Sequence, residues 1–507
     1  MFTIKITFIS FGYDVTGAPV RILSSILRNN GYQTQLIFVF TQGDTFELNQ
    51  KSLDSIVHIC KDSDIIGITV LTAHFTLAIQ ASKAIKIVNP DKIILWGGMH
   101  PTIRPDECLE HADYVCVGEG DRAVLDLIKS IDSGQKEPQI KGIWYGAQKT
   151  GFGELTENLN SIPTRDFSFK DHWLIENETG EYRDLNKAIY IELCTPKYKD
   201  LQGKYRCYYR TSTSRGCPYQ CTYCNNNIFH KNYQNHFRKR SIENVIDELE
   251  SVIKSNPFIK MIHFIDDSFL SRNIDEIRLF QILYKEHIGI PFRIIAYPTS
   301  ITKDKLDLLI DAGLCHVSMG IESGSQTTLK KYERYMKTDS IIESAKLLNV
   351  YATSKKIEPP SYDIIYNNPF ESEKERYETL NIMYQIPRPC TYSFYNLIPY
   401  PETKYYYQMK EAGLIFDETN QIYKASYKSE PEDYPTILMF CLKWIPVWIL
   451  KRMNADNILN RTILYSFMKY KHKEGIVINQ IKYANTLPKK ILIQKIKNKI
   501  WRNENGK

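Results

Sequence analysis

The sequence predicts an α/β protein in which a Rossmann-like (flavodoxin-like) parallel sheet is followed by a full or partial β/α barrel of the TIM type. Two stretches carry this prediction, residues 1–145 and residues 201–415, because in both of them short apolar strands alternate with amphipathic helices. Continuous apolar strands that alternate with helices are typical of parallel sheets covered on both faces. A chain of 507 residues is also long enough for roughly two or three domains.

Within residues 1–145, the loops at the expected strand ends are rich in glycine, threonine and histidine. They read FGYDVTGAP, TVLTAH, GGMHPT and VGEGD, and each lies at the end of a short apolar run. Ligands of open parallel sheets bind at the carboxyl ends of the strands, where glycine lets the backbone approach a ligand closely. These loops therefore predict a ligand site along one edge of the sheet. Because no GxGxxG follows the first strand, a dinucleotide is a poor candidate.

Residues 146–200 lose the alternating pattern, and we expect them to be a linker packed on the surface. A second series of strands and helices then fills residues 201–415. Active sites of β/α barrels lie at the carboxyl ends of the strands. The loop TSTSRGCPYQCTYCNN, residues 211–226, follows the first strand of this series, so we expect it at that rim.

Beyond residue 415 the strand pattern ends, and we expect residues 416–507 to form a mainly helical, basic extension. Residues 438–507 contain fifteen Lys or Arg against three Asp or Glu, whereas the whole chain carries a formal net charge of +7. The tail includes LPKKILIQKIKNKIW, an amphipathic basic pattern that is consistent with contact to a membrane surface. A solvated basic face is the interpretation that we favour.

The most apolar run of this extension is LMFCLKWIPVWIL, residues 438–450. It is too short to span a bilayer, which needs about 20 residues, and it contains Lys443 and Pro446. We interpret it as a packed helix hairpin. A substrate lid or a contact with a membrane surface is the alternative.

The composition is that of a globular protein from a reducing compartment. Hydrophobic residues make up 43% and charged residues 24% of the chain. The start, MFTIKITFISFGYD, reads as a buried strand and not as a secretion signal, because its apolar run is short and contains Lys5. The eleven cysteines are an odd number and are scattered outside one cluster, which argues against a disulfide framework. We therefore expect a cytoplasmic protein, with association to a membrane as the alternative.

Three cysteines, Cys217, Cys221 and Cys224, lie within eight residues. Tetrahedral zinc sites and most iron–sulfur clusters take four protein ligands, so these three cysteines leave the fourth ligand position of such a site unassigned. A structural zinc site would need a fourth ligand such as Cys207 or His230, but the paired CxxC motifs of zinc ribbons are missing. A cluster held by three thiolates keeps one iron open for another ligand, and an open iron implies reactivity.

The CxxxCxxC spacing, with the aromatic residue Tyr223 before the last cysteine, resembles the signature of the radical S-adenosylmethionine (SAM) superfamily. The resemblance implies a 4Fe-4S cluster on Cys217, Cys221 and Cys224, which makes them the catalytic and metal-binding residues. It also implies that SAM is chelated by the open iron and is cleaved to a 5′-deoxyadenosyl radical after electron transfer. Tyr223 is expected to lie beside these cofactors.

Later segments continue this resemblance. HFIDDSF, with Asp266 and Asp267, resembles the second-strand segment of the family. MGIESGSQTTLKKYER resembles the fourth-strand segment, whose acidic residue, here Glu322, typically holds the ribose hydroxyls of SAM. The resemblance therefore implies contacts of Asp266, Glu322 and the adjacent Ser323 with the cofactor.

Two positions depart from the family pattern. YNNPFES stands where the family usually has a segment resembling GLPGET; it keeps Pro369 and Glu371 but places Asn367 at the position of a glycine. Asn tolerates a positive φ better than other non-glycine residues, so we expect the turn to survive. In IPYPETKYY, which resembles the last barrel strand, Glu402 replaces a usual glycine.

The N-terminal half resembles the cobalamin-binding domain that precedes many radical SAM enzymes. The resemblance rests on ITVLTAH, WGGMHPT and VGEGD, in this order and at successive strand ends. It implies that cobalamin contacts Thr69, Leu71, Gly97, Gly98, Gly118, Glu119 and Gly120. A cofactor-free flavodoxin-like domain, which needs the glycines only for turns, is the alternative.

The DxHxxG segment that gives cobalt a histidine in proteins of the methionine-synthase type is missing here. After the first strand the sequence reads GYDVTGAP, with Asp14 and Gly17 but no histidine between them. His74 and His100 lie in other loops, and we interpret them as polar loop residues. We therefore expect cobalamin to bind without a protein histidine below the cobalt.

Taken together, the resemblance implies a cobalamin-dependent radical SAM enzyme. The reaction expected from this layout is methylation of an unactivated carbon of a small or lipid-like metabolite. A cyclase or rearrangement enzyme without net methylation has the same architecture, and a non-catalytic cobalamin or iron–sulfur sensor is a third interpretation. An RNA methylthiotransferase is disfavoured, because Cys60, Cys108 and Cys116 do not form the second cysteine cluster that it needs.

The expected partners follow from this chemistry. They are the small-molecule or lipid-like substrate and an external one-electron reductant of the flavodoxin or ferredoxin type. Peripheral contact with a membrane through the basic tail is an additional hypothesis. We do not expect nucleic acid as a partner.

Overall fold

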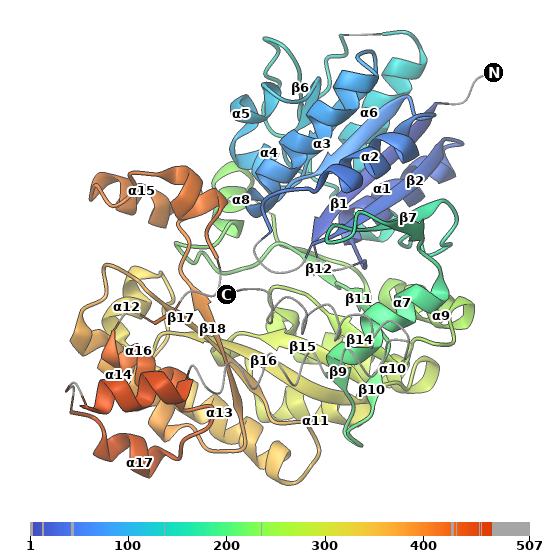
Figure 1. The fold of residues 1–507 in the computed structure, drawn as a ribbon. Helices are drawn as coiled ribbons and strands as arrows, with labels where there is room; N and C mark the ends of the chain where they lie inside the picture. The colour runs from blue at the N-terminus through green and yellow to red at the C-terminus, as the bar shows by residue number, and fades with distance from the viewer. Residues whose placement is uncertain are drawn as a thin grey trace, which may run out of the picture.

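The computed structural model describes residues 4–468, apart from residues 13–14, 42–44, 136, 235, 427–429, 432, 456 and 458. Two α/β units dominate the molecule, and Figure 1 shows the N-terminal unit in blue above the second unit in green to orange. Each unit is built on one sheet of mainly parallel strands with helices packed against it.

The N-terminal sheet has eight strands in the order β6-β5-β4-β3-β1-β2-β7-β8. The strands from β5 to β7 run parallel, and the two edge strands are antiparallel to their neighbours. This arrangement confirms the predicted Rossmann-like sheet. The strands are β1 (Lys5–Gly12), β2 (Gln33–Phe40), β3 (Ile65–Thr69), β4 (Ile93–Gly97), β5 (Tyr114–Cys116), β6 (Ile143–Trp144), β7 (His172–Glu176) and β8 (Tyr182–Asp184).

Helices cover both faces of this sheet. Neighbouring residues of a strand point to opposite sides, so that Phe8 joins one apolar core and Ile9 joins the other. Helices α1 and α6 pack on the Phe8 side, and α2 and α3 pack on the Ile9 side. The helices are α1 (Ala18–Asn29), α2 (Gln50–Cys60), α3 (Phe75–Val88), α4 (Met99–Ile103), α5 (Pro105–Leu109) and α6 (Gly120–Asp132).

Part of the segment that we expected to be a linker belongs to the N-terminal sheet. Residues 172–184 form β7 and β8, and β7 pairs in parallel with β2. The strand β7 reads HWLIE and is mostly buried. The linker prediction for residues 146–200 is therefore wrong over this stretch, because five residues of strand between charged and aromatic residues are too short to stand out in the sequence.

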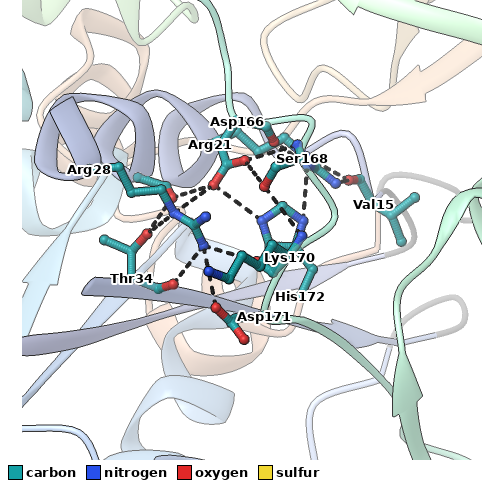
Figure 2. A network of polar contacts seen from close by, with 10 residues as sticks. Val15, Arg21, Arg28, Thr34, Asp166, Ser168, Lys170, Asp171 and His172 are labelled. Carbon is teal, nitrogen blue, oxygen red and sulfur yellow. Dashed lines mark hydrogen bonds and ion pairs between the residues drawn. The ribbon is translucent and has the colours of Figure 1, made fainter. Parts of the chain in front are cut away.

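Arg21, a buried arginine of α1, binds Asp166, which precedes β7 in the same segment 146–200 (Figure 2). Arg21 donates hydrogen bonds to the carbonyl oxygens of Val15, at 2.9 and 3.2 Å, and of Asp166, at 2.5 Å. The carboxylate of Asp166 lies 3.2 Å from Nε of Arg28 and 3.3 Å from Nε2 of His172. Burial raises the pKa of the Asp166 carboxyl, but its hydrogen bonds, from His172 first, outweigh burial and lower that pKa below its ordinary value.

The second sheet has six parallel strands in the order β11-β14-β15-β16-β17-β18. Since β11 and β18 each have one neighbour in this order, the predicted barrel is a partial one. In β16 the apolar Val317, Met319 and Ile321 are fully buried in the core, whereas Ser318 and Glu322 alternate with them on the other face. The strands are β11 (Tyr208–Thr211), β14 (Met261–Phe264), β15 (Phe292–Ala296), β16 (Leu314–Glu322), β17 (Ser361–Tyr366) and β18 (Thr391–Asn396).

Polar caps start several of the helices between these strands. The side chain of Ser241 accepts a hydrogen bond from the first turn of α9, and Asn273 and Ser372 form capping boxes with Glu276 and Glu375. Such caps satisfy backbone N–H groups that have no partner within the helix. The helices are α9 (Ile242–Ser255), α10 (Ile274–His287), α11 (Lys303–Ala312), α12 (Gln326–Lys331), α13 (Thr338–Thr353) and α14 (Glu373–Gln385).

After β18 the chain returns to the N-terminal domain. Helix α15 (Lys404–Glu411) and the π-helix Thr419–Tyr423 lie there, and Figure 1 shows α15 in orange beside the blue unit. The side chains of Tyr406 and Tyr423 are buried in the same apolar core as Ile9. The N-terminal domain is therefore completed by residues that follow the barrel.

Two further helices, α16 (Tyr434–Cys441) and α17 (Val447–Arg452), pack on the outside of the barrel. Helix α16 contacts α14 and is buried over most of its length, and α17 begins directly after Pro446. These two helices agree with the helix hairpin expected over residues 438–450. Within the described residues we find no helix with the length and apolar character needed to cross a membrane. The basic residues 469–507 lie outside the described residues.

The Arg21 contacts predict a large loss of stability when this side chain is removed. We expect Arg21→Ala to lower the free energy of unfolding of the N-terminal domain by about 3 kcal/mol, because it leaves buried carbonyl oxygens without donors. Urea denaturation followed by tryptophan fluorescence measures the change. Arg183→Ala, which removes an ion pair with Glu176 at the surface, should change it by less than about 0.5 kcal/mol. Equal urea midpoints for the two variants would contradict this prediction.

Candidate active site at the cysteine loop and the domain interface

The cysteine loop begins directly after β11 and is held by a small hairpin of β12 (Ser214–Arg215) and β13 (Arg238–Lys239). Gly216 has a φ of +79°, and a Cβ atom there would lie 2.6 Å from the carbonyl oxygen of His236. The amide of Cys217 donates to the ring of His236, with 3.4 Å between N and Nε2. The glycine before the first cysteine is therefore required for the turn that presents Cys217.

The three cysteines of this loop lie close enough to one another and to Asp267 for their charges to interact. Burial raises the pKa of the Cys217 and Cys224 thiols to about 12, and the neighbouring Cys221 thiol and the Asp267 carboxyl act in the same direction. In the described part of the chain, no three His, Cys, Asp or Glu side chains are grouped closely enough to hold one metal ion. A cluster has a different requirement, because its thiolates bind different irons. Three thiols on one tight loop fit that requirement.

The alternative zinc ligands, Cys207 and His230, have other contacts in the structure. Cys207 is buried in the apolar core that also contains Phe8. Nε2 of His230 lies 2.9 Å from the carbonyl oxygen of Tyr219, and its ring lies 3.8 Å from the ring of His236. These contacts argue against a closed site of four protein ligands at this loop.

A buried arginine lies beside the second cysteine. Nη1 of Arg334 lies 3.7 Å from Sγ of Cys221, and its guanidinium covers the ring of Tyr297 at 4.3 Å. Its Nε has no hydrogen-bond partner among the described residues. A buried cation stabilises the thiolate form of a nearby cysteine. Sequence reasoning did not identify this arginine as a site residue, although it lies in the segment MGIESGSQTTLKKYER that resembles the family.

Glu322 and Tyr223 lie in the same region as this arginine. Glu322 ends β16 with a φ of +66°, which is uncommon for a residue other than glycine and often marks functional sites. Burial raises its pKa to about 7, with Arg334 lowering the value and Asp363 raising it. Tyr223 is buried edge-on against Tyr332, with 5.0 Å between the ring centroids. The structure thus brings two of the predicted cofactor contacts close to the cysteine loop.

A cavity of about 360 Å³ lies between the N-terminal sheet and the second unit. Leu71 does not line it and is 52% exposed. The second unit contributes side chains that include Ser212, Arg215, Phe229 and Ile265. The N-terminal domain contributes six of the predicted residues, Thr69, Gly97, Gly98, Gly118, Glu119 and Gly120.

The glycines of this cavity are needed for its shape. Gly98 has a φ of +109°, and a Cβ atom there would lie 3.0 Å from the carbonyl oxygen of Val70. Gly118 has a φ of +96°, and a Cβ atom there would lie 2.7 Å from the hydroxyl of Tyr233. Mostly apolar walls with few polar groups are typical of cofactor sites. The cavity therefore fits part of a bulky cofactor.

Two family models match the parts of the chain that carry these features. The model of the radical SAM superfamily matches residues 211–383, and the model of the B12 binding domain matches residues 4–128. The chain therefore carries an N-terminal B12-binding domain followed by a radical SAM domain. It is an enzyme, and the two domains imply a 4Fe-4S cluster, SAM and cobalamin as cofactors.

Several named proteins are similar to this radical SAM protein over most of its length. An anaerobic magnesium-protoporphyrin IX monomethyl ester cyclase of Rubrivivax gelatinosus is 25% identical, over 80% of this chain and 69% of its own. A cytidylyl-2-hydroxyethylphosphonate methyltransferase of Streptomyces wedmorensis is 24% identical, over 80% of both chains.

Two solved structures of radical SAM enzymes share the fold. OxsB with aqua-cobalamin bound has a TM-score of 0.63 and 17% identity, covering 93% of this chain and 72% of its own. TsrM from Kitasatospora setae, a radical SAM methyltransferase solved with tryptophan and a SAM analogue, has a TM-score of 0.60 and 15% identity, covering 80% and 76%.

Two predicted contacts of the radical SAM domain are engaged with protein atoms. The carboxylate of Asp266 accepts hydrogen bonds from the amide of Thr213, at 2.9 and 3.0 Å, and from the hydroxyls of Thr213 and Ser214, at 2.8 and 2.5 Å. Ser323 donates to Glu371 at 3.2 Å. Asp266 therefore supports the start of the cysteine loop before Cys217, and the neighbouring Asp267 lies close enough to the thiols for its charge to act on them.

The two loop histidines of the B12-binding domain pack inside the protein. Burial lowers the pKa of His74 to about 4 and that of His100 to about 3. His100 lies against the rings of Phe75 and Tyr423, with 4.6 and 5.3 Å between centroids. Neither histidine lines the cavity. Both are therefore packing residues in this structure.

Four charged residues join the B12-binding domain to the hairpin that holds Cys217. Arg215 forms an ion pair with Asp121, and its Nη1 lies 3.4 Å from Glu119. Nη1 of Arg238 donates to the same Glu119 at 3.0 Å. We refer to Glu119, Asp121, Arg215 and Arg238 as the interdomain clasp. The predicted cobalamin contact Glu119 thus lines the cavity and also binds the radical SAM domain.

The clasp predicts that Arg215→Gln loosens both sides of the interface. Asp121 is left partly buried without its partner, which is strongly destabilising, and Glu119 keeps only Arg238. We expect faster hydrogen exchange in residues 117–121 and 212–217, and cobalamin affinity lower by roughly tenfold. Arg122→Gln, at an exposed arginine that pairs with Glu154, is the matched control. Identical exchange in the two variants would show that the clasp does not hold the interface.

Burial of His74 predicts acid sensitivity of the B12-binding domain. Its pKa is about 4 in the folded protein against an ordinary 6.5, so between these values the unfolded chain binds more protons. The free energy of unfolding should therefore fall as the pH falls from 6.5 to 4, by up to about 1.4 kcal/mol per pH unit for one histidine. Urea denaturation of His74→Gln should give a shallower pH dependence. His58→Gln, at an exposed histidine of the same domain, should keep the pH dependence of the wild type. Equal slopes of unfolding free energy against pH for the two variants would contradict the prediction.

Proposed function

We propose that this enzyme is a cobalamin-dependent radical SAM methyltransferase that acts on an unactivated carbon of a small or lipid-like metabolite. The observation that carries the proposal is the cavity between the two domains, because loops of the B12-binding domain and residues that flank the cysteine loop line it together. Relatives with methyltransferase names agree with this choice. When bound, the cluster and SAM supply a radical that removes hydrogen from carbon, and cobalamin supplies the methyl group.

The residues of this chain would hold and shield these groups. Cys217, Cys221 and Cys224 would bind the cluster, and Arg334 would offset the negative charge of the thiolates. Glu322, whose carboxyl is buried at the end of β16, would accept hydrogen bonds from SAM. The apolar walls of the cavity would exclude water from the reacting carbon.

A second candidate function is cyclisation or rearrangement without net methylation. One relative is named a magnesium-protoporphyrin IX monomethyl ester cyclase and aligns with 80% of this chain. The two functions differ in the product, because only the methyltransferase adds the mass of a methyl group. Metabolite profiling of a strain that lacks the protein, by mass spectrometry, would separate them.

We further propose an external one-electron reductant of the flavodoxin or ferredoxin type as a partner. We also propose peripheral membrane contact through the basic tail, of which residues 469–507 lie outside the described residues. The described part presents Trp444 and Trp448 at its surface, 40% and 60% exposed, next to Lys451. Tryptophan beside basic residues is typical of surfaces that contact membranes.

The proposal predicts that SAM cleavage depends on the cysteine loop. Reconstituted protein should show the absorption of a 4Fe-4S cluster, bind cobalamin and form 5′-deoxyadenosine under reduction. Cys221→Ala should abolish cluster absorption and 5′-deoxyadenosine formation, because one iron loses its thiolate. Cys207→Ala, at a buried cysteine of the N-terminal core, should retain both. Cleavage of SAM by the Cys221→Ala variant would overturn the proposed function.

A further inference from the structure

The segment Lys330–Lys337 lies directly against the cysteine loop. Thr222, between the second and third cysteines, donates from its amide to the carbonyl oxygen of Tyr332 at 3.1 Å and from its hydroxyl to that of Lys331 at 3.2 Å. Nη1 of Arg334 contacts Sγ of Cys221 at 3.7 Å. The segment therefore touches the loop through two backbone carbonyls and one buried cation.

The opposite side of this segment forms an open hollow at the surface. The hollow is lined by Gln326, Lys330, Arg334, Tyr335, Met336 and Lys337. Tyr335 is 77% exposed, whereas Arg334 is 5% exposed. Because Arg334 lines the hollow and also contacts Cys221, one side chain separates this surface from a thiol of the cysteine loop.

The hollow is basic. Lys330 and Lys337 are exposed on its rim, and no carboxylate of the described residues lies within ion-pair distance of either. Glu333 lies in the same segment, but its carboxylate is paired with Lys404 at 2.7 Å. None of the residues that line the hollow is acidic. A partner with a negatively charged surface would therefore be attracted to it.

We propose that this hollow is the docking site of an acidic one-electron carrier protein that reduces the cluster. The inference rests on the proposed function, since only a redox cluster at the cysteine loop needs such a carrier. In the step, the carrier is oxidised by one electron and the cluster is reduced by one electron, which it then passes to SAM. The carrier is of the flavodoxin or ferredoxin type, and Arg334 is a positioning residue between its docking surface and Cys221.

The cavity between the two domains is a poorer entrance for electrons. It lies between the N-terminal sheet and the radical SAM domain, and Glu119, Asp121 and Arg215 of the interdomain clasp line it. A protein carrier needs an open surface, which the hollow offers. Substrate and reductant would thus approach the radical SAM domain from different directions.

The test compares a protein reductant with a chemical one. We would measure 5′-deoxyadenosine formation by the reconstituted full chain, first with reduced flavodoxin at increasing concentration and then with titanium(III) citrate. For Lys330→Glu/Lys337→Glu we expect the KM for flavodoxin to rise about tenfold at low salt, with unchanged rates under titanium(III) citrate. Direct titration of flavodoxin should show a matching rise in Kd. High salt should remove the difference between wild type and variant, because it screens the charges.

Two controls make the result specific. Lys330→Arg/Lys337→Arg should keep the KM of the wild type, and Lys51→Glu/Lys129→Glu, at exposed lysines of the B12-binding domain, should leave it unchanged. An unchanged KM for Lys330→Glu/Lys337→Glu would overturn the docking site. An equal loss with titanium(III) citrate would also overturn it, because the lysines would then act on the cluster and not on the carrier. If the wild type forms no 5′-deoxyadenosine with titanium(III) citrate, the proposed function itself has failed.

Discussion

The pairing of Arg215 and Arg238 with Glu119 and Asp121 is the interaction on which the site depends. It joins the loop after β5 and the start of α6 to the hairpin that leads into Cys217. Charges taken out of water stabilise a structure only as pairs, and removal of one partner leaves a costly unpaired charge. The clasp therefore defines one relative position of the two domains. In that position Arg215 lines the cavity and also belongs to the start of the cysteine loop.

The cysteine loop is held from three sides by groups that are not themselves reactive. The turn at Gly216 packs closely on His236, Asp266 binds the start of the loop at Thr213, and Thr222 donates to the carbonyls of Tyr332 and Lys331. Asp266 and Thr222 are buried polar residues whose hydrogen bonds are made within the protein. A loop that must present three thiols at a fixed spacing needs this support, because its own backbone forms little regular structure.

Features that depend on local sequence were predictable. The parallel sheets follow from the alternation of apolar strands and helices, and the cavity glycines were found from their place at strand ends. Contacts made across long sequence distances were not predictable. Arg334 looks like an ordinary surface arginine in KYER until β16 and the cysteine loop are brought together. The role of Asp266 was expected to be cofactor binding, yet its carboxylate is occupied by Thr213 and Ser214 from the neighbouring strand end.

The return of the chain to the N-terminal domain after β18 has a consequence for synthesis of the protein. Tyr406, Ile422 and Tyr423 fill a core whose other members were made hundreds of residues earlier, such as Ile9 and Ile37. A nascent B12-binding domain on the ribosome lacks these side chains, although domains generally fold in order from the N-terminus. Its first sheet can bury one of its faces fully only after the whole radical SAM barrel has been translated.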